Sequence, residues 1–116
     1  MAWPKDVEAI LSRGLSLHES GVNNWALKKD EVFAALEEFE RIGIPVLGGD
    51  VYELDHGKPI SNYDNWYCDP NTGEARHSFV QRSIDRARKY INAYRNPRGR
   101  ETLFVLVAGW PHANSK

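Results

Sequence analysis

The amino-acid sequence predicts an α+β domain in which about three helices pack against a small antiparallel or mixed sheet. Apolar residues recur at the three- and four-residue spacing of an amphipathic helix over residues 28–41 and again over 74–94. Residues 103–108 are apolar without interruption, which is typical of a strand covered on both faces. The predicted order of helix, helix, strands, helix and strand favours the α+β class.

Length and composition indicate one folding unit. The chain has 116 residues, of which 41% are hydrophobic and 27% charged, and both values are close to those of globular domains. No repeat, low-complexity segment or linker divides it. We therefore expect a single domain over residues 1–116, with its core at about 4–108 and a tail over 109–116.

The sequence also bears on the compartment. Cys68 is the only cysteine, so an intrachain disulfide is excluded and a reducing environment is favoured. The N-terminus lacks the pattern of a signal peptide, and no apolar run approaches the roughly 20 residues that cross a bilayer. We expect a cytoplasmic protein with no membrane association.

The N-terminal region is predicted to contain a short helix followed by an irregular connection. Pro4 suits the first turn of a helix, and Gly14 is predicted to end it. The apolar stripe of this helix consists of Val7, Ile10 and Leu11. Residues 15–27 mix Leu, Ser, Gly and Asn, and we expect no regular structure there, with Trp25 turned inward.

The second helix, over about residues 28–41, is predicted to end at Gly43, because glycine takes up the left-handed conformation of a helix terminus readily. Extended structure follows over 44–47, is interrupted by two glycines at 48–49, and resumes over 50–54. The glycine pair has neither the spacing nor the lysine of a phosphate-binding loop. A bulge or turn is therefore predicted there.

A hairpin is predicted next. Residues 55–58 form its turn, because Gly57 can adopt a positive φ, and the chain returns along residues 63–69. After a loop, a long third helix covers about 74–94. The last strand, over 103–108, is expected to lie in the interior of the sheet.

Charge is distributed unevenly along a chain whose net charge is only −1. Between Asp30 and Asp69 there are ten carboxylates and two basic residues, a local balance of −8. Between Pro70 and Arg100 there are eight basic and two acidic residues, a local balance of +6. Such polarity says little about fold, but it steers encounters with partners.

The acidic segment 50–55 raises the question of catalysis. Asp50, Glu53 and His56 could act as acid and base or hold a divalent cation, as in a small metal-dependent hydrolase or nucleotide-processing enzyme. In a regular strand, however, Asp50 shares its face with Tyr52 while Glu53 points to the other face. We favour a solvated or partner-facing edge. The hydrolase is the alternative, and it requires the three groups to converge in one pocket.

The most unusual segment is the aromatic and acidic stretch over residues 63–69. If extended, it places Trp66 and Cys68 on one face, and Tyr67 and Asp69 on the other. Trp66 taken alone is more typical of a core residue. Tyrosine and tryptophan are also enriched where protein interfaces concentrate their binding energy. Scaffold and recognition surface are therefore both open interpretations of this segment.

Metal and nucleophile chemistry have little support. The four histidines lack the spacing of metal ligands on one element, and Cys68 has no second cysteine to pair with. These histidines are His18, His56, His77 and His112. We predict neither a metal site nor a cofactor.

The basic face of the third helix is a weaker candidate for nucleic-acid binding. Arg82, Arg86 and Lys89 align on it. The domain is nevertheless slightly acidic, with an isoelectric point near 6.4, and it lacks stacking aromatics interleaved with the basic residues. A solvated helix face is favoured, and nucleic acid is not the expected partner.

Three segments are distinctive as sequence strings. They read GVNNWAL over residues 21–27, GIPVLGGDVY over 43–52 and YDNWYCD over 63–69. These segments resemble the immunity protein 40 family of bacterial polymorphic toxin systems. The resemblance extends from about residue 10 to residue 107, which is nearly the whole predicted domain.

The resemblance implies a protein that binds and neutralises a cognate toxin and has no catalytic activity of its own. It implies no catalytic residues, and it does not identify the toxin. Combined with the acidic and aromatic character of residues 50–69, it leads us to expect the toxin-facing surface there. The predicted toxin-binding residues are Asp50, Tyr52, Glu53, Tyr63, Asp64, Trp66, Tyr67 and Asp69.

Overall fold

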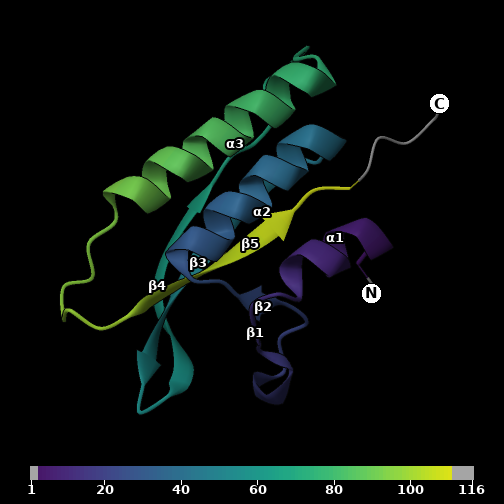
Figure 1. Ribbon diagram of the computed structural model, residues 1–116. Coiled ribbons are helices and arrows are strands. Elements are labelled where there is room, and N and C mark those ends of the chain that lie inside the picture. The colour runs from purple at the N-terminus through teal and green to yellow at the C-terminus, as the bar shows by residue number, and fades with distance from the viewer. Residues whose placement is uncertain (1–2, 111–116) are drawn as a thin grey trace.

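The computed structural model describes residues 3–110, which fold into three helices and two small antiparallel sheets, confirming the predicted α+β class (Figure 1). In chain order the elements are α1 (Lys5–Leu11), β1 (Leu15–Ser16), the short 3-10 turn η1 (His18–Ser20), β2 (Trp25–Ala26), α2 (Lys29–Ile42), β3 (Val46–Asp55), β4 (Lys58–Tyr67), α3 (Arg76–Ala93) and β5 (Thr102–Ala108). The predicted tail, with His112, lies outside the described residues except for Gly109 and Trp110. No helix within 3–110 is long and apolar enough to cross a membrane.

The helix boundaries follow local chemistry. At the start of α2 the Glu31 carboxylate accepts a hydrogen bond from the Lys28 backbone N–H at 2.8 Å, which caps the first turn. The helix ends at Gly43, as predicted, with a φ of 76°. Helix α1 ends earlier than predicted, at Leu11. Gly14 is needed for a different reason, since a Cβ there would lie 2.6 Å from the carbonyl oxygen of Ala26.

The main sheet has the strand order β4-β3-β5, and both pairs are antiparallel. Strands β3 and β4 form the predicted hairpin, and Gly57 turns the chain with a φ of 80°. The predicted interruption at residues 48–49 is wrong, because β3 runs through it without a break. A bulge, one of the two features predicted there, is present, because the register against β5 shifts between Val46 and Gly48.

Strand β5 lies at the edge of the three-stranded sheet, so its predicted interior position is wrong. Both of its faces are nevertheless covered: Phe104 and Leu106 belong to the large core, while Leu103 and Val105 belong to a smaller one. Its outer edge is protected by Leu27, which exchanges two backbone hydrogen bonds of 2.8 Å with Phe104.

Residues 15–27, predicted to be irregular, form a compact unit of β1, η1 and β2. Strands β1 and β2 pair with each other, and Trp25 is buried as predicted. Leu17 and Ala26 pack on the smaller core, on one side of β5. The Asn24 side chain donates to the carbonyl oxygen of Leu106 at 2.9 Å, which ties the unit to the sheet.

Helices α2 and α3 lie side by side over one face of the main sheet, and α1 lies beside α2 (Figure 1). The large core fills this interface with residues from all three helices and from β3, β4 and β5. On the opposite face, the unit of β1, η1 and β2 covers only the part near Leu103 and Val105. The sheet therefore has one face covered by helices and one that is partly open.

The two glycines of β3 permit a close contact with β4. Trp66 is buried and stacks on Tyr90 of α3, with ring centroids 4.7 Å apart. Its ring crosses Gly49, where a Cβ would lie 2.2 Å from Cη2 of the indole. A Cβ on Gly48 would lie 2.3 Å from the backbone oxygen of Trp66. The glycine pair therefore makes room for this tryptophan in the core.

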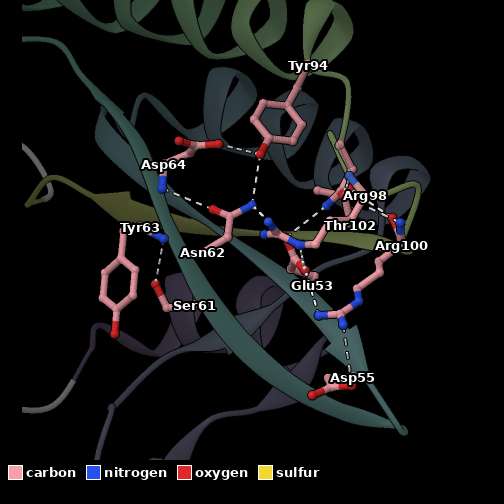
Figure 2. Close-up of polar contacts among 11 residues, drawn as sticks. Glu53, Asp55, Ser61, Asn62, Tyr63, Asp64, Tyr94, Arg98, Arg100 and Thr102 are labelled. Atoms are coloured by element: carbon pink, nitrogen blue, oxygen red, sulfur yellow. Dashed lines mark hydrogen bonds and ion pairs between the residues drawn. The ribbon is translucent and has the colours of Figure 1, made fainter.

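A buried carboxylate anchors the connection between α3 and β5. Glu53 of β3 has no exposed surface, although the sequence suggested a solvated or partner-facing edge. Arg98 donates to it at 2.6 and 3.1 Å, and Arg100 donates at 3.1 Å (Figure 2). Asn62 and Asn96 each donate at 3.2 Å. The hydrogen bonds from Arg98 chiefly outweigh the effect of burial and lower the pKa of Glu53 from 4.5 to about 2.

The contact between Gly49 and Trp66 can be tested by chemical denaturation. Gly49→Ala should lower the free energy of unfolding by about 1–3 kcal/mol, the usual effect of overpacking a core. In a Trp66→Phe background the ring atoms nearest to the new methyl group are absent, so the loss should be smaller. Equal losses in the two backgrounds would show that the indole does not impose this constraint.

Glu53 should make stability depend on pH. Its folded-state pKa lies below the ordinary value, so its contribution is complete above pH 4.5 and is lost as pH falls toward about 2. At neutral pH, the melting temperature of Glu53→Gln should be lower than that of the wild type. This difference should narrow as the pH falls from 4.5 to about 2. Thermal unfolding of both proteins across this pH range measures the difference in melting temperature. The exposed-site control Glu37→Gln should show no such convergence, and a pH-independent gap for Glu53→Gln would contradict the ionic anchor.

Candidate functional site

The alternation of β3 and β4 divides the predicted residues between the two faces of the sheet. Gly49 pairs with Trp66, whose ring reaches α3, so these two face the helices. The neighbouring pairs, Asp50 with Asn65 and Gly48 with Tyr67, therefore face the opposite way. The predicted segment 50–69 thus contributes to both faces.

The face away from the helices carries a group of exposed and half-buried side chains, most of them polar or aromatic, which we call the open face. It consists of Asp50, Tyr52, Tyr63, Asn65, Tyr67 and Val107. Tyr63 is 84% exposed and Tyr67 is 66% exposed. Exposed aromatic side chains next to a carboxylate are characteristic of protein-binding surfaces.

Asp50 lies at the centre of the open face. The residue is exposed, but partial desolvation by its neighbours raises the pKa of its carboxyl group. Tyr52, two residues along the same strand face, is half-buried, and burial likewise raises the pKa of its phenol. The negative charge of Asp50 and the proximity of Tyr63 raise the pKa of Tyr52 further, so these three side chains form one local group.

Tyr63 projects from a bulge in β4. The strand carries three residues between Ser61 and Asn65, opposite a single residue of β3. The backbone of Tyr63 has a φ of 70°, a conformation that residues other than glycine seldom adopt. Its N–H donates to the Ser61 hydroxyl at 3.1 Å, and its carbonyl accepts from the Asn65 side chain at 3.1 Å.

The two neighbours of Tyr63 point toward the helices and hold the bulge from behind (Figure 2). The Tyr94 hydroxyl, at the end of α3, donates to the Asp64 carboxylate at 2.5 Å and accepts from the Asn62 side chain at 2.8 Å. The Asn62 side chain also accepts from the Asp64 N–H at 3.0 Å. Burial, reinforced by the bond to Asp64, raises the pKa of Tyr94 to about 12. The ring of Tyr63 points away from this network.

The remaining predicted residues lie elsewhere. Glu53 and Trp66 are buried, so in this conformation neither can contact a partner, and Trp66 is a core residue. Asp64 is exposed, but its carboxylate is bonded to Tyr94. Asp69 is exposed just after β4. Sequence reasoning did not select Asn65, although it lies within the predicted segment 63–69. It missed Val107 and Tyr94, because only the strand register and the packing of α3 bring them to this region.

The groups required by the hydrolase alternative do not converge. Asp50 is on the open face, whereas Glu53 is buried on the helix-facing side among its arginine and asparagine partners. His56 lies at the tip of the hairpin, with its side chain 96% exposed, and contacts Asp55. The three groups are separated in this way, so the arrangement on which that alternative depends is not formed.

The basic face of α3 is largely engaged within the protein. Arg82 forms two hydrogen bonds with the Glu74 carboxylate, at 2.7 and 2.8 Å, and donates to the Asp69 carbonyl at 2.6 Å. These bonds lower the pKa of Glu74 to about 2. Arg86 donates to the Tyr67 carbonyl at 2.7 Å. Both arginines thus secure the end of β4, whereas Lys89, the third residue of the predicted basic face, is exposed.

The described residues also offer no metal centre. Within 3–110, no three His, Cys, Asp or Glu side chains are grouped so that they could hold an ion. Cys68 is a free, buried thiol whose Sγ accepts from Arg82 at 3.2 Å. The His18 ring is hydrogen-bonded to Ser16 and Asn23 and packs edge-on against Trp25.

Comparison with known proteins is informative at the level of the family. No curated protein and no solved structure matches the chain. The family model described as Immunity protein 40 matches residues 16–108, which include the open face, the bulge and the Glu53 anchor. The match covers most of the 116 residues and agrees with the resemblance seen in the three sequence segments. The chain belongs to the immunity protein 40 family.

Proposed function

We propose that this protein binds and neutralises a cognate toxin domain of a bacterial polymorphic toxin system, and that it does so without catalysis or a cofactor. Membership of an immunity protein family supports this function. The free thiol of Cys68 is compatible with a reducing compartment, and the cytoplasm of the producing cell is where we expect the protein to act.

The observation that carries the proposal is the open face. Two of its tyrosines, Tyr63 and Tyr67, are exposed on a sheet whose other side is packed against helices. Tyrosine provides a large contact area and loses little conformational freedom on binding, which is why it recurs among the residues that dominate interface energies. We therefore place the toxin interface on the open face, in agreement with four of the eight residues predicted from sequence: Asp50, Tyr52, Tyr63 and Tyr67.

Charge supports the same surface. Asp50 and Asp69 are exposed on β3 and just after β4, and neither carboxylate takes part in an ion pair within the described residues. Carboxylates at such a surface would attract a basic toxin surface and raise the rate of association. A basic surface of that kind is expected where a toxin acts on phosphate-bearing substrates.

The function itself can be tested by co-expression. The toxin-like domain encoded by the reading frame directly upstream should arrest growth when expressed alone, and this protein should restore growth when it is co-expressed. A folding-competent variant such as Glu37→Gln should rescue equally well. If the domain is harmless, or kills in the presence of this protein, toxin neutralisation is not the function.

The location of the interface can be tested with Tyr67→Ala. Its affinity for the same toxin domain should fall about fivefold or more, as for truncation of an interface anchor. Its free energy of unfolding should change by less than about 0.5 kcal/mol, because the side chain is largely exposed. Ile60→Ala is the matched control, since Ile60 is exposed but pairs with Glu53 and so lies on the other face. Weakening by Ile60→Ala instead would move the interface to that face.

A further inference from the structure

Asp50 is an exposed carboxylate on the open face, and it differs from the carboxylates that are partly or fully enclosed within this protein. Glu53 is paired with Arg98, Glu74 with Arg82 and Glu40 with Arg88. These arginine pairs provide the compensation that an enclosed carboxylate normally requires. Within residues 3–110, by contrast, Asp50 has neither an ion-pair partner nor a side-chain hydrogen bond, although it lies beside the half-buried ring of Tyr52.

Tyr63 projects toward the same face of the sheet as Asp50, although its backbone conformation is unfavourable. A left-handed conformation is unfavourable for any residue with a Cβ, and glycine is the residue that usually occupies it. The conformation is held by the hydrogen bonds of Ser61, Asn62 and Asn65 and, through Asp64, by the Tyr94 hydroxyl. Conformations of this kind persist where surrounding structure enforces them, and they cluster at functional sites.

We propose that Asp50, Tyr52 and Tyr63 form a cradle that receives one arginine or lysine side chain of the toxin domain, with Tyr94 acting as a positioning residue for Tyr63. The inference rests on the proposed function and specifies its recognition chemistry. The cationic head would pair with the Asp50 carboxylate, while its stem and charge lie against the tyrosine rings.

The chemistry of the cradle favours a cation over the other possible occupants. An anionic group, including a nucleic-acid phosphate, would be repelled by Asp50. An apolar side chain would remove the exposed carboxylate from water and give it no partner. A basic side chain satisfies the carboxylate and also benefits from the electron-rich faces of two tyrosines.

The first test measures binding of the upstream-encoded toxin domain to Asp50→Asn. Affinity should fall about tenfold or more, which is the range for loss of a hydrogen bond to a charged group. The dependence of affinity on salt concentration should also become weaker. Glu37→Gln makes the same change of charge on the exposed side of α2, and it should leave both quantities close to those of the wild type.

The second test separates recognition from stability. Tyr63→Gly should weaken binding about tenfold or more, while its melting temperature stays unchanged or rises, because glycine accepts the positive φ. His56→Gly is the matched control: His56 also has a positive φ, of 54°, but it lies at the hairpin tip. It should show the same effect on stability and no effect on affinity.

The third test concerns Tyr94→Phe, which removes the hydroxyl that holds Asp64 and Asn62. Binding should weaken at temperatures where the variant remains fully folded, and the change should vanish in a Tyr63→Gly background. A purely structural role would lower the melting temperature without this coupling.

These measurements distinguish the cradle from the function on which it rests. If the wild type neither binds the toxin domain nor restores growth, the proposed function and the cradle are both overturned. If the wild type binds, and Asp50→Asn and Tyr63→Gly bind with wild-type affinity, the cradle alone is overturned. An affinity for Asp50→Asn above that of the wild type would indicate an anionic or apolar occupant and would also overturn it.

Discussion

The buried carboxylate of Glu53 is the interaction on which the geometry of this protein depends most directly. The connection between α3 and β5 is rich in arginine and has little apolar surface with which to attach itself to the sheet. Arg98 and Arg100 attach it through Glu53 instead. An ionic contact therefore covers this end of the sheet, in the place where a longer helix could have made a hydrophobic contact. The desolvation of the carboxylate is tolerable only because several donors surround it.

The hydrogen bonds around the Glu53 carboxylate also determine the arrangement of the open face, on the other side of the sheet. Asn62 donates to both Glu53 and Tyr94, and its side-chain oxygen accepts from the backbone of the bulge. Because Asn62 and Asp64 are held on the helix side, Tyr63 between them is turned toward the opposite side. The arrangement of the open face is therefore determined by hydrogen bonds that no partner on that face would touch, and binding need not reorganise them.

The sequence allowed prediction of whatever depends on local pattern. Hydrophobic spacing located α2 and α3, glycine chemistry located the end of α2 and the hairpin turn, and strand alternation correctly separated Asp50 from Glu53. It could not predict that Glu53 is buried, because its arginine partners follow more than forty residues later in a loop. The edge position of β5 could not be predicted from the sequence either. An apolar run has the same pattern whether its outer edge is covered by a further strand of the sheet or by the short unit of β1, η1 and β2.

These contacts also change how the charge of residues 30–69 should be understood. Its local balance of −8 suggests a broadly acidic surface. In the folded protein, however, Glu38 pairs with Arg13, Glu40 with Arg88 and Glu53 with Arg98, so part of that charge is compensated internally. On the open face one carboxylate, Asp50, remains among the tyrosines. Recognition by such a surface depends less on long-range attraction, which salt weakens, than on whether a partner presents a cation at the right position.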